Sequence, residues 1–214
     1  MLSLFHPRSS QSHPTPVLQG RRQVIRAGLL AGLALALGGC KKADPAAVKS
    51  SSVDLSHLAL TGQFHLQDVD GNTKTLQDYR GKVLLVIFGY TQCPDVCPTS
   101  LARAADIRRD LGERGNRLQV LFVSVDPERD TPEILRAYAS AFDPTFVALR
   151  GTDEQPAEAA KAYGAFYRKV PTRTSYTMDH SALHYVVDAE GKVRFGLQYE
   201  SSAQDCAQAI GTLL

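Results

Sequence analysis

The chain has 214 residues, which is enough for one domain of ordinary size together with additional segments. It carries 24 Lys and Arg against 22 Asp and Glu, for a formal net charge of +2. Residues 1–39 contain four arginines and no acidic residue, so the remaining residues have a net charge of −2. That near-neutral balance argues against a protein that binds nucleic acid.

The first 39 residues have the pattern of an export signal. Basic residues precede the apolar run AGLLAGLALALGG, whose 13 residues are too few to span a bilayer, which requires about 20. The run ends in LGGC, which resembles the bacterial lipoprotein processing box and implies that Cys40 is the lipidated first residue of the mature protein. Arg21 and Arg22 also resemble a twin-arginine signal, which leaves the Sec and twin-arginine export routes open. We therefore expect an exported lipoprotein that faces the periplasm, with the inner membrane favoured and an uncleaved anchor disfavoured.

A flexible tether and a β-hairpin are predicted next. Residues 40–58 are small and polar, with Pro, Ala and Ser, a composition typical of a flexible linker. The globular pattern occupies residues 59–214. It begins with alternating residues around Asp70-Gly71-Asn72, which predict a β-hairpin.

Apolar runs and turn signals in the rest of the chain predict alternating strands and helices. The run 82–90 is apolar, β-branched and aromatic, as in a strand that is covered on both faces. Further strands are expected at 118–125, 145–149, 182–188 and 192–199, and helices at 98–112, 131–142, 154–163 and 203–213. This order is that of an α/β protein. With two cysteines at the first strand-to-helix turn, it indicates a thioredoxin-like fold, in which helices flank a central mixed sheet and the N-terminal hairpin is an addition.

Cys93 and Cys97 lie between strand 82–90 and the helix predicted from Pro98. The positive end of a helix stabilises thiolates and lowers thiol pKa values, so the pair is expected to be redox-active. Residues four apart on a helical path can face one side, where two sulfurs could close a disulfide or hold one soft metal ion. A closed zinc site is disfavoured because it normally requires four ligands. The other cysteine after the lipoprotein box, Cys206, is interpreted as a core residue of the last helix, and its spacing gives no support for a resolving role.

His180 is the histidine best placed to join the cysteines. It lies in the sequence MDHS, just before the predicted strand 182–188. In a thioredoxin-like layout the loop that enters this strand faces the cysteine turn, which favours a ligand role. His184 falls inside the strand and His65 in the N-terminal hairpin, and both are interpreted as ordinary strand residues.

Three segments in register closely resemble the Sco/SenC family of copper chaperones: YTQCPDVCPTSL, SVDPERDTPE, and DHS followed by a strand. The resemblance extends from about Gly62 to the C-terminus. It implies that Cys93, Cys97 and His180 are metal ligands and that the protein binds copper, both as Cu(I) and as Cu(II). It also implies a partner, which is cytochrome c oxidase subunit II or another periplasmic copper protein. In the family, assembly of the dinuclear copper centre of that subunit uses the protein as metal donor, thiol reductant or both.

The charged residues near these motifs each have two interpretations. Asp95 and Asp179 could orient the ligands or a partner, or be solvated loop carboxylates. Four charged residues of the second motif could line the site entrance or shape the loop: Asp126, Glu128, Arg129 and Asp130. The structural role is favoured for these four, with Thr131 as the cap of the following helix.

A membrane-tethered thiol–disulfide oxidoreductase is the alternative function. Cys93 or Cys97 would attack a partner disulfide and the other would resolve it, which would keep the copper-site cysteines of the oxidase reduced. Such a cycle requires a thiol reductant as a further partner. A peroxide-reducing enzyme of the same fold is disfavoured, because no cluster of Thr and Arg is evident near Cys93.

Overall fold

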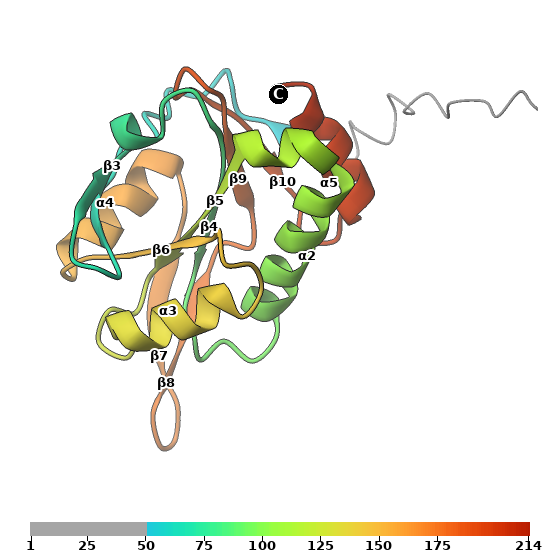
Figure 1. Ribbon diagram of the computed structural model, residues 1–214. Helices are drawn as coiled ribbons and strands as arrows, with labels where there is room; N and C mark the ends of the chain where they lie inside the picture. Colours follow the sequence, from blue (N-terminus) through green and yellow to red (C-terminus); the bar gives the residue numbers. More distant parts are fainter. Residues whose placement is uncertain (1–50) are drawn as a thin grey trace, which may run out of the picture. The chain divides into compact units, whose positions relative to one another are not determined.

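The longest apolar runs of the sequence form the two central strands of a mixed β-sheet. The computed structural model describes residues 51–214 (Figure 1). In it, β4 (Val83–Gly89) and β5 (Leu118–Ser124) run parallel with all of their residues buried. Continuous apolar sequence is what such strands require, because helices cover both faces of the sheet at this position.

Six further strands extend the sheet on both sides of this pair. They are β1 (Ser52–Asp54), β2 (His65–Asp68), β3 (Thr73–Thr75), β6 (Val147–Arg150), β9 (His184–Val187) and β10 (Val193–Leu197). The strand order is β1-β10-β9-β4-β5-β6-β2-β3. Strands β4, β5 and β6 are parallel, and all other neighbours pair antiparallel. The sheet is therefore mixed, as the sequence predicts.

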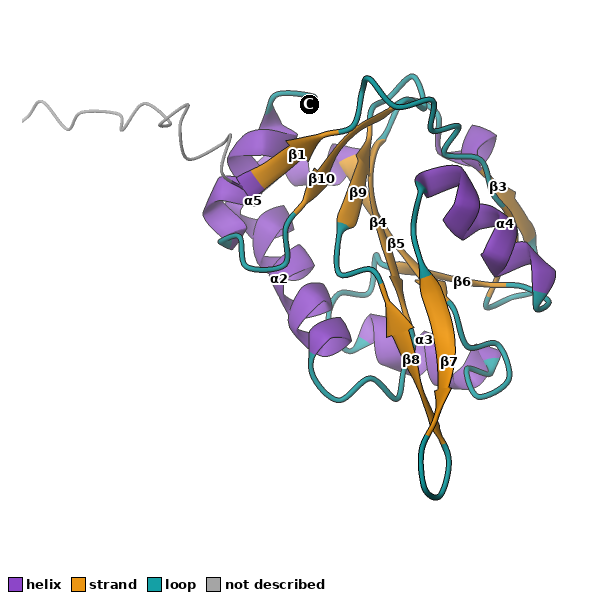
Figure 2. Ribbon diagram, turned by 180° about the vertical axis from the view of Figure 1, so that it is seen from behind, coloured by secondary structure: helices purple, strands orange, loops and turns teal. Residues whose placement is uncertain are grey.

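Helices cover both faces of the sheet. They are α2 (Val96–Asp110), α3 (Pro132–Ser140), α4 (Glu154–Tyr163) and α5 (Ala203–Gly211), with short 3-10 helices η1 (Leu76–Tyr79) and η2 (Gly112–Arg117). Figure 1 and Figure 2 show α2, α3 and α5 on one face and α4 on the other. Helices α2 and α3 lie on the same face because each connects neighbouring parallel strands, β4 to β5 and β5 to β6, by a right-handed crossover in the same direction along the sheet. This arrangement confirms the predicted α/β, thioredoxin-like fold.

The starts of two helices are fixed by local chemistry. Thr131 caps α3, since its Oγ1 accepts a hydrogen bond from the N–H of Ile134 at 3.3 Å and Pro132 occupies the first turn. Helix α2 begins at Val96, two residues before the predicted start at Pro98. Cys97 therefore belongs to the first turn of α2 and not to the loop before it.

The structure contains a second, two-stranded sheet that the sequence pattern did not predict. Strands β7 (Tyr167–Pro171) and β8 (Tyr176–His180) form an antiparallel hairpin that extends away from the main sheet (Figure 2). His180 is the last residue of β8, whereas the sequence places it in a loop before strand 182–188. This correction matters for the site, because His180 is carried by a hairpin with its own pairing.

The sheet also begins earlier than the sequence pattern predicts. Strand β1 lies inside the segment 40–58, which was predicted to be a tether, and pairs antiparallel with β10, with Val53 opposite Gly196. The predicted export signal and Cys40 lie outside the described residues. Within residues 51–214, no helix is long and apolar enough to cross a membrane.

Candidate metal centre

The two cysteines occupy different environments at the end of β4. Cys93 is half-buried in the loop that follows the strand, and Cys97 is 1% exposed at the start of α2. The backbone N–H of Cys97, in the first turn of α2, donates a hydrogen bond to Cys93 Sγ at 3.4 Å. Both thiols are free. The sulfur of Cys93 is therefore partly accessible to solvent, whereas that of Cys97 is enclosed.

Gly89, the last residue of β4, makes room for the buried sulfur. A Cβ atom at this position would lie 2.7 Å from Cys97 Sγ and 2.7 Å from Phe122 Cε2. Both distances are far shorter than a van der Waals contact, which is about 3.5–4.0 Å. Only a residue without a side chain lets Cys97 pack against the strand end at this distance.

The β7–β8 hairpin brings His180 to the cysteines. His180 Nε2 lies 3.4 Å from Cys97 Sγ, and its Nδ1 lies 3.1 Å from the carbonyl oxygen of Ser181. A carbonyl can only accept, so Nδ1 donates in that bond and the remaining nitrogen, Nε2, is the one available to a metal. The Tyr90 ring packs edge-on against the imidazole, with ring centroids 5.9 Å apart. The histidine is thus held with the correct nitrogen toward the sulfurs.

Together these three side chains form a candidate metal centre. Ligand atoms of Cys93, Cys97 and His180 all lie within 4.8 Å of one another, and residues 51–214 contain no other such group of Cys, His, Asp or Glu. Two thiolates and an imidazole are soft and borderline ligands, which suit copper. A structural zinc site requires a fourth ligand, which the described residues do not supply to this group. The donor set therefore fits copper better than structural zinc.

Hydrogen bonds within the site separate the two thiols in acidity. The hydrogen bond from the Cys97 thiol, with those from His180 and the backbone N–H groups of Asp95 and Cys97, lowers the pKa of Cys93 despite partial burial. The same bond together with burial raises the pKa of Cys97. Burial opposes charge on His180, but its hydrogen bonds to Cys93 and to the Ser181 carbonyl outweigh burial and raise its pKa. The metal-free site therefore favours thiolate at Cys93 and protons on its two neighbours.

Asp130 anchors the start of the cysteine loop to the end of β5. Its buried carboxylate accepts hydrogen bonds from the N–H and hydroxyl of Thr91, at 3.1 and 2.6 Å, and from the hydroxyl of Ser124 at 2.6 Å. Burial raises the pKa of Asp130, although these hydrogen bonds oppose the shift. Because Thr91 lies two residues before Cys93, this network supports the structural interpretation of the second motif.

The two aspartates next to the ligands make no hydrogen bond to them through their carboxylates. Asp179 forms an ion pair with Arg168 at 2.8 Å, and both side chains are at least half exposed. Asp95 is exposed at the start of α2 and makes no side-chain capping bond, although its N–H helps to stabilise the Cys93 thiolate. The structure thus favours solvated carboxylates at both positions.

The remaining histidine and cysteine candidates are structural. His184 is buried in β9, where its Nδ1 accepts a hydrogen bond from Arg103 Nη2 at 3.1 Å. Cys206 is fully buried in α5. His65 is exposed in β2, with Gln155 Nε2 at 3.4 Å from its ring. None of them joins the group formed by the two site cysteines and His180.

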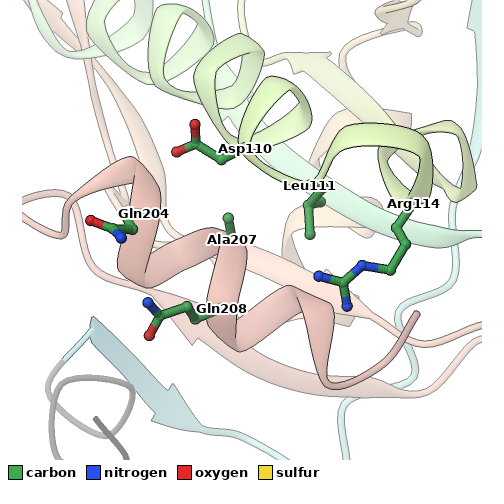
Figure 3. A pocket seen from close by; sticks show the side chains of 6 residues that line it. All are labelled: Asp110, Leu111, Arg114, Gln204, Ala207 and Gln208. Carbon is green, nitrogen blue, oxygen red and sulfur yellow. The ribbon is translucent and has the colours of Figure 1, made fainter. Parts of the chain in front are cut away.

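A pocket of about 390 Å³ between α2 and α5 lies apart from this centre (Figure 3). Its lining residues are Asp110, Leu111, Arg114, Gln204, Ala207 and Gln208. Figure 3 shows Asp110 at the end of α2, Arg114 on η2, and Gln204, Ala207 and Gln208 on α5. Arg114 Nη1 donates to the Gly211 carbonyl at 3.4 Å. The lining contains no cysteine or histidine, so this pocket has none of the soft ligands of the metal centre.

Sequence reasoning missed three features that position the site. The sequence gives no sign that position 89 must be glycine, because the clash of a Cβ atom there with Cys97 Sγ arises only when α2 packs against the end of β4. The bond between Asp130 and Thr91 joins residues 39 positions apart. The hairpin left only a weak signal, since apolar and polar residues alternate at 176–180 after the polar turn 172–175 but do not alternate at 167–171.

Fold and site together define a thioredoxin-like protein with a candidate Cys-Cys-His metal centre. The SCO1/SenC family profile matches residues 53–214. Mitochondrial Sco2 of Saccharomyces cerevisiae is 37% identical over 139 residues, which are 63% of this chain but only 46% of the yeast protein. A Sco2-like protein of Rickettsia felis is 32% identical over 157 residues, covering 72% of this chain and 77% of its own. The structure of Bradyrhizobium japonicum ScoI with copper bound is 38% identical with a TM-score of 0.67, covering 73% of this chain and 100% of its own.

The chain therefore belongs to the SCO1/SenC family. The matched region spans less than half of the yeast relative, so that comparison concerns the domain and not the whole yeast protein.

Proposed function

We propose that this protein is a copper chaperone that helps to assemble the dinuclear copper centre of cytochrome c oxidase subunit II. Copper is its cargo, bound by Cys93 Sγ, Cys97 Sγ and His180 Nε2. The observation that carries the proposal is the convergence of these three ligand atoms within 4.8 Å from a loop, a helix and a hairpin. The similarity to copper-bound ScoI of B. japonicum supports the identity of the metal.

The arrangement suits a metal that must be passed on. A site with three ligands leaves the metal open to a fourth ligand from a partner, and Cys93 is the ligand cysteine that reaches solvent. Cys97 is enclosed and would hold the metal while the partner's ligand replaces Cys93. Transfer by stepwise ligand exchange follows from this difference in exposure.

Copper titration of the reduced protein tests the proposal. We expect one Cu(I) per chain for the wild type, and loss of that stoichiometry in Cys93→Ala, Cys97→Ala and His180→Ala. His65→Ala is the matched control, because it removes an exposed histidine outside the centre. Unchanged stoichiometry in the His180 and Cys93 variants would refute the assignment of the ligands.

Thiol–disulfide exchange is a second candidate function, and the unequal environments of the two thiols favour it. The thiolate of Cys93 would attack a partner disulfide, forming a mixed disulfide and releasing one partner thiolate. Cys97, once deprotonated, would then attack Cys93 Sγ, which releases the second partner thiolate and leaves a Cys93–Cys97 disulfide. The partner gains two electrons, and an exported dithiol reductant would return this protein to its reduced form.

The two functions respond differently to the same substitutions. Cys97→Ser is expected to trap the mixed disulfide with the partner, which is seen on non-reducing gels. His180→Ala is expected to remove copper binding and to leave disulfide reduction largely intact. Loss of reductase activity in His180→Ala to the same extent as in Cys93→Ser would contradict the separate thiol reductant role.

We further propose an exported protein anchored in the inner membrane through lipidated Cys40 and joined to the domain by a tether. The basic and apolar composition of residues 1–39 and the LGGC sequence support this location. Cys40→Ala is expected to release the protein from the membrane fraction or to leave it unprocessed. If the Cys40→Ala variant, which cannot be lipidated, still associated with the membrane at the wild-type level, the lipoprotein anchor would be excluded.

A further inference from the structure

The hairpin that carries His180 has no backbone pairing with the main sheet. Strands β7 and β8 pair with each other alone among the described strands. Figure 2 shows the hairpin reaching beyond the end of the large sheet. The position of His180 relative to the cysteines therefore depends on side chains that tie the hairpin to the loops beside it.

Arg129 touches three segments of the site at once. Its Nε forms an ion pair with the carboxylate of Asp126 in its own loop. Its Nη1 donates to the backbone carbonyl of Tyr176 in β8 at 3.0 Å and to Gln92 Oε1 in the cysteine loop at 3.2 Å. One guanidinium thus joins the loop after β5, the hairpin and the cysteine loop.

The Tyr176 ring completes this contact. The Arg129 guanidinium lies 3.7 Å from the ring centroid and the Lys169 ammonium lies 3.8 Å from it. The Tyr176 hydroxyl donates to Asp126 Oδ1 at 2.8 Å. Arg129 and Asp126 have side chains only 15% and 2% exposed, so the contact is largely shielded from water. Hairpin and loop are therefore held by stacking, charge and hydrogen bonding together.

A short path of ring contacts leads from Arg129 to the metal ligand. The Arg129 guanidinium lies 5.6 Å from the Tyr90 ring, and that ring packs edge-on against His180. The Tyr90 hydroxyl is 2.8 Å from Thr177 Oγ1, which fixes the ring to β8 as well. The same cluster that holds the hairpin therefore also borders the imidazole.

We infer that Arg129 is a positioning residue: it clamps the β7–β8 hairpin onto the cysteine loop and so keeps His180 Nε2 facing the two sulfurs. The clamp needs the planar, multi-donor guanidinium, because a lysine ammonium cannot stack on Tyr176 and reach the other acceptors together. The effect of the clamp on copper binding rests on the proposed function, but the clamp itself is a property of the metal-free protein.

Arg129→Lys tests the clamp while leaving a positive charge beside buried Asp126. We expect loss of amide hydrogen-exchange protection in residues 167–180 of the metal-free protein. We expect Cu(I) to be bound about 10- to 100-fold more weakly, the range typical when a residue that supports a metal ligand is changed, and therefore to pass faster from the copper-loaded protein to a competing chelator. The thiolate-to-Cu(II) charge-transfer band is expected to shift as the imidazole loses its fixed position.

Two further variants keep the test decisive. Tyr176→Leu removes the ring from the hairpin side and is expected to give the same loss of protection. Arg194→Lys is the matched control, since Arg194 pairs at 3.0 Å with Asp188, a carboxylate of similar burial at 5% exposed in the β9–β10 hairpin. It is expected to leave both hairpin protection and copper release at the wild-type level.

The outcomes separate the clamp from the proposed function. Wild-type hairpin protection in folded Arg129→Lys and Tyr176→Leu would overturn the clamp, whatever the copper measurements show. Lost protection with an unchanged copper release rate and spectrum would overturn the claim that the clamp positions His180. Failure of the wild type to bind copper would refute the proposed function, and the exchange data would still decide whether the clamp exists.

Discussion

Adding a single methyl group at Gly89 should weaken copper binding at the candidate metal centre and also lower the stability of the fold. The backbone of Gly89 lies outside the left-handed region, so Gly89→Ala introduces no strain in φ. Its effect is steric, because the new Cβ would stand 2.7 Å from both Cys97 Sγ and Phe122 Cε2. Phe122 is fully buried and has little room to move, so the sulfur at the start of α2 is the atom most easily displaced.

The size of the effect follows from these distances. Restoring van der Waals separation requires the sulfur and the ring to retreat by about 1 Å. Overpacking of this kind costs about 1–3 kcal/mol of unfolding free energy. For a domain of this size that lowers Tm by about 2–4 °C per kcal/mol. Metal–ligand distances tolerate only about 0.2 Å, so we expect Cu(I) affinity to fall by about 10- to 100-fold as well.

Thermal unfolding and competition with a Cu(I) chelator measure the two effects. Gly115→Ala is the matched control: it would place a Cβ 2.6 Å from the Arg108 carbonyl oxygen, far from the ligands, and should lower Tm without changing copper affinity. Removing the sulfur should relieve part of the strain, so Gly89→Ala should cost less stability in a Cys97→Ala background. An equal cost in both backgrounds, or wild-type copper affinity in Gly89→Ala, would refute the steric argument.

Three further predictions concern titration and buried hydrogen bonds. Burial and the neighbouring Arg103 lower the pKa of His184 from its ordinary 6.5 to about 3. Between these pH values the unfolded chain therefore binds one more proton than the folded chain. The contribution of neutral His184 to the free energy of unfolding is fully present above pH 6.5, and it falls by about 1.4 kcal/mol per pH unit as the pH drops from 6.5 toward 3. Denaturant titrations should show a shallower fall in His184→Gln. Asp130→Asn replaces an acceptor of three hydrogen bonds with a group that also donates, and should cost about 1–3 kcal/mol in the same assay. Because the pKa values of Cys97 and His180 are raised, Cu(I) affinity should increase with pH near and above 6.5. Calorimetry in buffers of different ionisation enthalpy should detect the released protons, and an affinity independent of pH would contradict the shifts.

The sequence determines the elements that local pattern can encode. The buried runs of β4 and β5, the Thr131 cap and the helix 154–163 are all readable, because apolar periodicity, capping side chains and turn residues act over a few positions. The cysteine pair and its position at a strand end follow from the same local reasoning. His180 was indicated by its place before strand 182–188 in a thioredoxin-like layout and by the resemblance to a known family, because no spacing along the chain links it to the cysteines.

The tertiary structure decides how these parts meet. Arg129 and Tyr176 are 47 positions apart, and nothing in either segment alone predicts that a guanidinium stacks on that ring. Gly89 matters only because α2 packs Cys97 against the strand end. The short hairpin strands β7 and β8 carry little continuous apolar sequence, so local patterning left them out and contacts with other loops hold them in place. The sequence by itself therefore determined which side chains can bind copper, and packing between distant segments decided whether they face one another.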